Sequence, residues 1–257
     1  MNTILEARGL MKSFGAVTAA NDICASISEH SVTGLIGTNG AGKTTFVNMV
    51  TGYLKPSGGT IHFAGRDITA LQPRQITRLG IARSFQIPQL YDTLTVRENL
   101  IVALGIVLRN AKQSFFSKLP IHVPGHQGSM DKVADHLMNQ FNLDGYGQRV
   151  ARVLPQGIRK QLDIAMAMAG KPQVLLLDEP TSGVAAEEKF GIMDMIMNVV
   201  RAEKVTVLFV EHDMDIISRY ADRVLAFYDG RIIADQAPEE ALNNPEVQRY
   251  VTGKRHA

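Results

Sequence analysis

The residue types most suited to chemistry lie between Gly37 and Thr45, where the chain reads Gly-Thr-Asn-Gly-Ala-Gly-Lys-Thr-Thr. This run fits the phosphate-binding pattern G-x-x-x-x-G-K-S/T at every fixed position. Glycines let such a loop turn its N–H groups inward through backbone angles that a Cβ would obstruct. Lys43 is expected to reach the β- and γ-phosphates, and the Thr44 hydroxyl to bind Mg²⁺. The run predicts a nucleotide site; the alternative is a glycine-rich turn that binds nothing.

The segments on either side of this loop have the pattern that the motif requires. Residues 32–36 form an apolar run typical of a buried strand, and residues 44–49 begin a helix. The loop would therefore lie at a strand-to-helix turn. There the partial positive charge of the helix N-terminus adds to the attraction for a phosphate.

Two further groups of polar residues each follow an apolar strand. Residues 174–177 lead into Asp178 and Glu179, and residues 205–210 lead into the segment that contains His212. In a parallel sheet covered by helices, ligand sites lie at the carboxyl ends of the strands. We therefore expect the two carboxylates to meet the phosphates; the alternative is simple solvation of a strand end.

Periodicity and turn residues predict the remaining elements. Residues 3–36 favour a small, largely antiparallel sheet, with Phe14 in a loop between its first two strands. A short helix over 74–79 is followed by a strand over 81–85 that ends at Gln86. The other predicted elements are strands at 4–7, 23–27, 60–63, 224–228 and 231–233, and a helix over 187–203.

The pattern is helical from Thr95 to about Val153, most clearly over 96–108 and 132–141. Residues 155–169 form a further predicted helix, with Pro155 in its first turn. Residues 99–130 contain no acid but several basic and aromatic residues: Arg109, Lys112, Phe115, Phe116 and Lys118. This stretch is either a solvated loop or a face near lipid headgroups or a membrane partner.

Composition restricts the class of protein. The chain has 257 residues, with 27 basic and 25 acidic residues, so its charge does not favour a nucleic-acid surface. Cys24 is the single cysteine, which fits a reducing compartment. A charge precedes any apolar stretch at the N-terminus, so we expect no signal peptide. The longest apolar run, Leu100 to Leu108, is far shorter than the roughly 20 residues of a membrane-spanning helix.

Phosphoryl transfer requires a phosphate cradle, a Mg²⁺ ion held by a hydroxyl and an acid, a group that orients water, and a sensor of the γ-phosphate. Residues of these types stand at suitable places: Lys43, Thr44, Gln86, Asp178, Glu179 and His212. The set resembles the ATP-binding subunit of an ABC transporter, and the resemblance covers nearly the whole chain. It implies ATP and Mg²⁺ as cofactors.

The resemblance also implies a role for each residue. ATP would be held by the Walker A residues Gly37, Asn39, Gly40, Ala41, Gly42, Lys43, Thr44 and Thr45, and by Phe14, which falls where the family stacks an aromatic ring on adenine. Asp178 ends the Walker B strand, and Glu179 is similar to the glutamate that activates water. Gln86 resembles the Q-loop glutamine, and His212 the switch histidine at the γ-phosphate. The metal ligands would be Thr44, Gln86 and Asp178.

The family's fold is α/β: a P-loop ATPase core with a parallel sheet, an antiparallel β subdomain and an inserted helical subdomain. Residues 1–257 would form one ABC ATPase domain, with a core of 1–95 and 170–257 and a helical subdomain of about 96–169.

Two stretches depart from the family. The signature, usually Leu-Ser-Gly-Gly-Gln, is here Leu154-Pro155-Gln156-Gly157-Ile158, and Ala185 replaces an aspartate or asparagine. Both normally act at the partner's site.

The subfamily is narrowed by residues 83–86, residues 94–100, the long insert before the signature and the tail 238–253. These are similar to ATPases of branched-chain amino-acid type importers. Such a subunit would work with a second ATPase, identical or different, two permeases and a periplasmic binding protein, on the cytoplasmic face of the membrane. The same kind of ATPase serves amides, urea and aromatic acids, and these residues do not choose among the solutes.

Two other classes of function compete with this interpretation. A nucleic-acid or ribosome-associated ABC protein would be favoured by tandem ATPase domains, a long coiled coil or a basic tail, and the sequence has none of them. A regulatory module without hydrolysis is suggested by the altered signature. Lys43, Asp178, Glu179 and His212 are intact and favour an ATPase.

Overall fold

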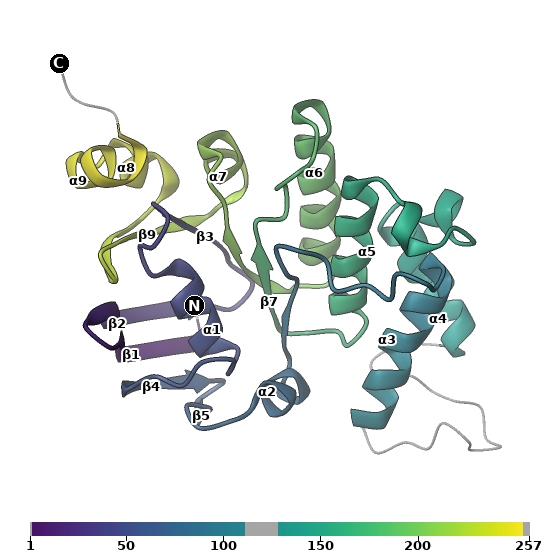
Figure 1. The fold of residues 1–257 in the computed structure, drawn as a ribbon, viewed down its shortest axis with the longest axis horizontal. Helices are drawn as coiled ribbons and strands as arrows, with labels where there is room; N and C mark the ends of the chain where they lie inside the picture. The colour runs from purple at the N-terminus through teal and green to yellow at the C-terminus, as the bar shows by residue number, and fades with distance from the viewer. Residues whose placement is uncertain (1, 111–127, 254–257) are drawn as a thin grey trace. The chain divides into compact units, whose positions relative to one another are not determined.

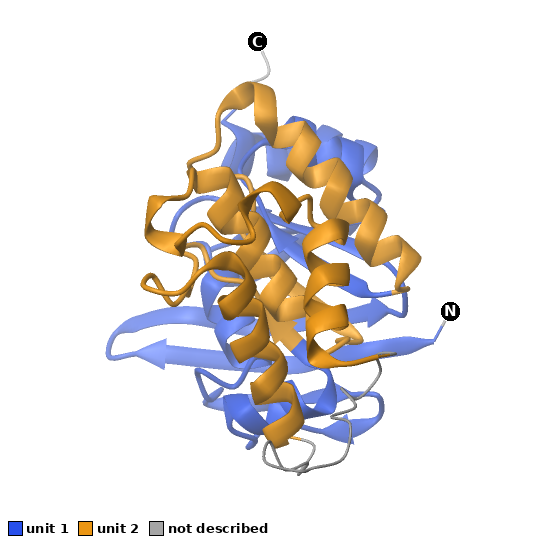
Figure 2. Cartoon of the chain, turned by 90° about the vertical axis from the view of Figure 1, so that its right-hand side faces the viewer, with its two compact units in different colours: residues 1–81, 205–257 blue, residues 82–204 orange. Residues whose placement is uncertain are grey.

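The structure is a computed structural model that describes residues 2–110 and 128–253 (Figure 1). Part of the acid-free stretch, including Phe115 and Phe116, lies outside the described residues. The chain divides into two compact units, coloured in Figure 2: unit 1 is residues 1–81 and 205–257, and unit 2 is residues 82–204. These boundaries differ from the predicted core and helical subdomain, and that subdomain division stays a prediction.

Unit 1 carries two groups of strands. One is antiparallel, in the order β2-β1-β4-β5, and the other has the order β10-β9-β3-β8, with β3 parallel to both of its neighbours. The elements of unit 1 are β1 (Thr3–Phe14), β2 (Val17–Ser28), β3 (Val32–Gly37), α1 (Lys43–Val50), β4 (Gly58–Phe63), β5 (Arg66–Asp67), α2 (Pro73–Leu79), β8 (Thr206–Val210), α7 (Met214–Tyr220), β9 (Arg223–Tyr228), β10 (Arg231–Gln236), α8 (Pro238–Asn243), α9 (Pro245–Val247) and the π-helical turn η3 (Gln248–Thr252).

Burial explains the two strand types. Every residue of β3 and β8 is buried, as expected for parallel strands that are covered on both faces. Strands β1 and β2 are only partly buried and run well beyond the predicted segments. The prediction that Phe14 lies in a loop is wrong, because it is the last residue of β1 and pairs with Val17. The hairpin continues because its polar residues can face solvent without interrupting the backbone hydrogen bonds.

Unit 2 is largely helical. Helix α3 contacts both α4 and α5, and α5 also packs against α6 and β7 (Figure 1). Its elements are β6 (Ile81–Arg83, which begins at the unit boundary), α3 (Val96–Asn110), α4 (Met130–Gln140), the 3₁₀ turns η1 (Asp144–Tyr146) and η2 (Ala151–Val153), α5 (Gln156–Met168), β7 (Val174–Asp178) and α6 (Ala186–Ala202). Helices were predicted over α3, α4, α5 and α6, and all four predictions are confirmed.

Two predicted boundaries in unit 2 are wrong. Strand β6 ends at Arg83 instead of Phe85, because the Phe85 N–H donates to the Asp163 carboxylate and so leaves the strand ladder. Pro155 is the N-cap of α5 instead of part of its first turn, because its ψ of 152° is extended.

Within the described residues, no helix has both the length and the apolar character that a membrane span requires.

Candidate active site

The phosphate loop of unit 1 joins the end of β3 to the start of α1 at Lys43. Thr38, Asn39 and Gly40 are exposed at its tip, and the Thr44 side chain is exposed on the first turn of α1. The Ala41 N–H donates to the Thr38 carbonyl oxygen at 3.2 Å. The structure thus places the loop at the strand-to-helix turn that the sequence predicts.

Two glycines in this loop are required by close backbone approaches. A Cβ at Gly42, where φ is 107°, would lie 2.8 Å from the Ala19 carbonyl oxygen, and a Cβ at Gly37 would lie 2.5 Å from the Phe227 carbonyl oxygen. No side chain can occupy either position without moving the neighbouring backbone. Ala19 comes from β2 and Phe227 from β9, so neighbouring strands of unit 1 hold the loop on two sides.

Lys43 is 6% exposed, and its ammonium group donates to the carbonyl oxygens of Gly37 at 2.6 Å and Thr38 at 2.9 Å. Both acceptors are carbonyl oxygens of the loop, so the ammonium lies against the loop backbone. A phosphate bound in the loop would meet this ammonium as a point charge.

His212 follows β8, whose Val210 is the register partner of Leu35 in β3. Adjacent parallel strands end at the same edge, so His212 and the phosphate loop start from neighbouring strand ends. The His212 side chain is exposed, while its N–H donates to the carboxylate of Glu211, which is 4% exposed, at 3.2 Å.

The Phe14 ring is 53% exposed, with the Lys12 ammonium 5.4 Å from its centroid. Phe14 lies at the turn of the β1–β2 hairpin. The same hairpin contains Ala19, whose carbonyl oxygen lies close to Gly42. An exposed ring on the strand pair beside the loop is suited to stacking on a flat base.

In unit 2, Asp178 ends β7 and is 8% exposed. Its carboxylate Oδ2 lies 2.6 Å from a guanidinium nitrogen of Arg83, and the side chains of both partners are largely buried. The ion pair connects the ends of β6 and β7. The sequence did not identify Arg83 as the partner of Asp178. The two residues are 95 positions apart, and local sequence patterns do not predict such distant pairs.

Gln86 and Glu179 meet in the structure. The Gln86 side-chain amide donates to the Glu179 carboxylate at 2.7 Å, so two residues predicted to act on water are in direct contact. Glu179 has a φ of 49°, in the left-handed region that side chains other than glycine rarely adopt. Such strain persists only where surrounding contacts hold it, and here the Glu179 carbonyl accepts hydrogen bonds from Lys160 and from the Ser182 N–H, both at 3.1 Å.

Two charged residues of α5 beside this pair were not predicted. Lys160 is 2% exposed and Asp163 is 6% exposed, and both bind the backbone of the segment that carries Gln86. Burial raises the pKa of Asp163, while hydrogen bonds from the N–H groups of Phe85 and Gln89 and the charge of Lys160 lower it. No sequence pattern pointed to them, because periodicity treats charged residues on a helix as solvated.

Comparison with known proteins identifies the family. The model of the family described as "ABC transporter" matches residues 20–182, which is more than half of the chain. The chain belongs to the ABC transporter family. The predicted α/β fold is confirmed, and the chain is an ATPase of the ABC type that binds nucleotide.

Full-length ABC relatives are known. "High-affinity branched-chain amino acid transport ATP-binding protein LivG" of Salmonella typhimurium is 36% identical, and the alignment covers 98% of each chain. "High-affinity branched-chain amino acid transport ATP-binding protein BraF" of Pseudomonas aeruginosa is 34% identical, again over 98% of each chain.

Solved ABC cassettes share the fold. One described as an ATP-binding cassette of an ABC transporter has a TM-score of 0.82 and 31% identity, covering 97% of this chain and 98% of its own. An ADP conformation of such a cassette has a TM-score of 0.81 and 29% identity, with the same coverage.

The two stretches that depart from the ABC pattern lie next to each other in unit 2. Leu154 is buried, Pro155 and Gln156 are exposed, and Ile158 is partly buried. A Cβ at Gly183 would lie 3.3 Å from Cγ of Gln156, and one at Gly157 would lie 3.1 Å from Cδ1 of Ile192 on α6. The ABC signature segment therefore packs closely on the segment after Walker B.

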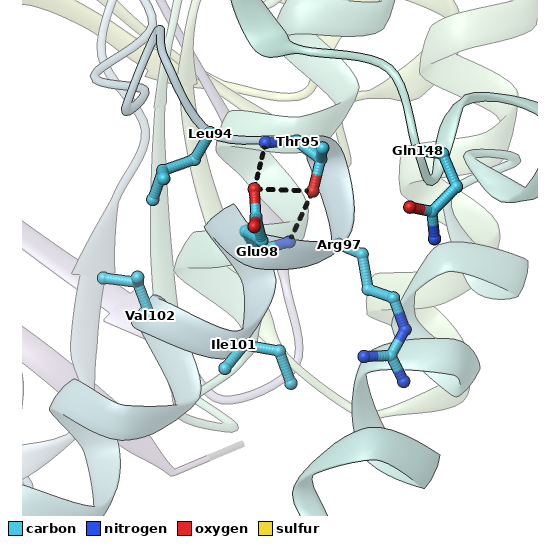
Figure 3. Close-up of a pocket in the computed structure, with 7 residues that line it drawn as sticks. All are labelled: Leu94, Thr95, Arg97, Glu98, Ile101, Val102 and Gln148. Carbon is cyan, nitrogen blue, oxygen red and sulfur yellow. Dashed lines mark hydrogen bonds between the residues drawn. The ribbon is translucent and has the colours of Figure 1, made fainter.

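A pocket of about 460 Å³ lies in unit 2, and Figure 3 shows the residues that line it. The side chains that line it come from the start of α3 and its surroundings: Leu94, Thr95, Arg97, Glu98, Ile101, Val102 and Gln148. Thr95 and Glu98 form a reciprocal cap, in which the Glu98 carboxylate accepts from the Thr95 N–H at 2.7 Å and the Thr95 hydroxyl accepts from the Glu98 N–H at 3.2 Å. The hydrogen bond from the Thr95 N–H, together with one from the Thr95 hydroxyl at 2.9 Å, lowers the pKa of the Glu98 carboxylate. None of the predicted nucleotide-binding residues lines this pocket.

The Arg83–Asp178 pair gives a test of this geometry. Arg83→Leu should lower the free energy of unfolding by about 3 to 5 kcal/mol, because it leaves a buried carboxylate without its charge partner. The matched control is Arg97→Leu. Arg97 pairs with Asp131 and Asp135, whose side chains are 69% and 58% exposed, so its loss should cost less than about 1 kcal/mol. Urea unfolding measures both, and equal losses would contradict the buried pairing.

Proposed function

We propose that the chain is the ATP-hydrolysing subunit of an ABC importer that energises uptake of branched-chain amino acids, or of a related amino acid, amide or organic acid. The full-length similarity to LivG and BraF carries this proposal, because it extends over 98% of the chain and not only over the nucleotide-binding motifs. The intact Lys43, Asp178, Glu179 and His212 support hydrolysis over a purely regulatory role.

In the proposed reaction, residues 37–45 bind the phosphates and Phe14 stacks on the adenine. Mg²⁺ would be held by Thr44, Gln86 and Asp178, whose oxygen atoms are the ligand type it prefers, and would compensate charge on the transferred phosphoryl group. Glu179 accepts a proton from the attacking water, and Gln86 orients that water through its contact with the Glu179 carboxylate. His212 stabilises the γ-phosphate.

The proposed assembly contains a second ATPase subunit, two permeases and, indirectly, a periplasmic solute-binding protein. This chain would lie on the cytoplasmic face of the membrane, bound to the permeases. A solved ABC cassette with 20% identity is described as a dimeric post-hydrolysis state with ADP and phosphate, and it supports the fold alone.

The proposal predicts different effects for two substitutions in the phosphate site. Lys43→Ala should weaken ATP binding by at least about tenfold, because it removes charge-assisted bonds to phosphate. Glu179→Gln should preserve binding and lower kcat by about 10²- to 10⁴-fold, because it removes the general base. Nucleotide titration and steady-state ATPase assays separate the two effects. A Glu179→Gln variant that hydrolyses ATP at the parental rate in the assembled complex would contradict the role of Glu179.

Gln86 lies between strand β6 and α3, the first helix of the helical region, and this place predicts that transport fails before chemistry when Gln86 is shortened. In reconstituted transporter, Gln86→Ala should reduce solute uptake per ATP hydrolysed. Uptake and ATPase rate are measured on the same vesicles. Gln89→Ala is the matched control, because Gln89 is also an exposed glutamine of this segment and its side-chain amide donates to the Ile87 carbonyl oxygen. If Gln86→Ala keeps both the parental uptake rate and the parental ATPase rate, Gln86 does not couple hydrolysis to transport.

The altered signature predicts two unequal ATP sites if the partner is a different ATPase. Pro155 has neither a hydroxyl nor an N–H, so up to two donors toward the partner's γ-phosphate are missing. Each such bond is worth about 1.5 to 3 kcal/mol, or roughly a tenfold to hundredfold effect on turnover. The site that this signature completes should bind ATP and hydrolyse it slowly, and this chain's own pocket should carry most hydrolysis.

Single-turnover analysis of trapped nucleotide distinguishes the two sites. Steady-state ATPase rates of single mutants do not, because two sites that hydrolyse ATP alternately also give equal losses of activity. Pro155→Ser combined with Gln156→Gly should accelerate the slow site. Equal single-turnover rates at both parental sites, or no change in the double variant, would refute the asymmetry.

A further inference from the structure

Lys160 binds both residues that the proposed function assigns to water activation. Its ammonium donates to the carbonyl oxygens of Gln86 at 2.5 Å and Glu179 at 3.1 Å, with the Phe85 carbonyl oxygen at 3.4 Å. Gln86 and Glu179 are 93 positions apart in the chain. One buried side chain therefore fixes the backbone of both, in addition to the hydrogen bond between their side chains.

Asp163 lies three residues further along α5 and binds the same segment through N–H groups instead of carbonyls. Its Oδ2 accepts from the Phe85 N–H at 3.0 Å, and its Oδ1 accepts from the Gln89 N–H at 3.0 Å. Residues i and i+3 of a helix lie on the same face, so the two side chains act together. The segment from Phe85 to Gln89 is thus held by a cation on its carbonyls and by a carboxylate on its amides.

Stability alone does not explain why two charged side chains are buried here. Lys160 and Asp163 are almost completely buried, and burial of charged groups carries a desolvation penalty that apolar residues of similar volume would avoid. One of their hydrogen bonds reaches Glu179, which holds a left-handed φ of 49°, and the others go to the segment from Phe85 to Gln89. A buried cation that binds both the Gln86 carbonyl and the carbonyl of the strained Glu179 indicates a geometric requirement at these two residues.

We propose that Lys160 and Asp163 are positioning residues that hold Gln86 and Glu179 in the geometry for ATP hydrolysis. This inference rests on the proposed function of those two residues. Helix α5 begins immediately after Pro155 of the signature. A displacement of the signature therefore moves Lys160 and Asp163, and with them both residues that act on water. The segment that faces the partner's ATP is in this way connected to the hydrolytic pair of this chain's own site.

The first test is the kinetics of Lys160→Met in the assembled complex. The variant should lower kcat by roughly tenfold to a hundredfold, with the KM for ATP within about twofold of the parental value, because the phosphate loop is untouched. Lys160→Arg should restore most of kcat, since a guanidinium can also donate to several carbonyls. Lys171→Met is the matched control, because Lys171 is an exposed lysine of the same unit, paired with Glu203 at 3.3 Å. It should keep parental kcat.

The second test separates positioning from a general structural role. In a Glu179→Gln background, Lys160→Met should cause little further loss of kcat, because a residue that acts through Glu179 has no effect once Glu179 is disabled. Amide hydrogen exchange should become faster at Phe85 and Gln89 in the single variant. Additive losses of kcat, or a fall in kcat that only parallels a fall in Tm, would overturn the proposal.

If Lys160→Met does not fold, Asp163→Asn takes its place, because it keeps the side-chain volume while offering one acceptor oxygen instead of two. It should lower kcat at unchanged KM and speed exchange at Phe85 or Gln89, and parental kcat would refute the positioning role. The two proposals fail differently. Absence of Mg²⁺-dependent ATP hydrolysis in the parental complex would contradict the proposed function, whereas parental hydrolysis that Lys160→Met leaves unchanged would contradict the positioning role alone.

Discussion

Strand β3 lies between β8 and β9, and its parallel hydrogen bonds to both strands fix the point at which the phosphate loop begins. Gly37 is the register partner of Phe227, and a Cβ at Gly37 would lie only 2.5 Å from the Phe227 carbonyl oxygen. The pairing of β3 with β9 at this point therefore requires a glycine at position 37. Because β8 ends beside β3, the same pairing brings His212 to the edge from which the loop emerges.

The two units hold their functional residues by different physical means. In unit 1, backbone geometry fixes the phosphate loop, through strand pairing, a helix start and two close approaches at glycine. In unit 2, side-chain charges fix the residues that are proposed to act in hydrolysis, since Arg83 holds Asp178 and Lys160 holds the carbonyls of Gln86 and Glu179. Backbone pairing tolerates most side-chain changes, whereas a buried charge tolerates few. Function in unit 2 should therefore be more sensitive to single substitutions outside the motifs.

The sequence predicted what depends on local pattern. Residues 37–45 could be assigned because strand, glycine loop and helix are contiguous, and β7 could be assigned because a buried strand ends visibly in Asp178. The end of β6 was misplaced, since the Phe85 N–H pairs with Asp163, 78 positions away. Periodicity treats a charge on a helix as a solvated residue, so it could not identify Lys160 or Asp163 as buried. The roles of the site residues remain predictions from the resemblance.

If the altered signature acts at the partner's phosphate as proposed, the start of α5 gives a physical reason to expect a weakened site that is not abolished. Pro155 is the N-cap of α5, and no side chain makes a capping hydrogen bond there. A serine in that position would accept a hydrogen bond from the first turn and could also donate its hydroxyl to a phosphate. Proline offers neither interaction, yet it leaves the N–H groups and the partial positive charge of the first helical turn in place. What remains is a backbone attraction for an anion, and what is lost is the hydroxyl donor together with the backbone N–H of that residue.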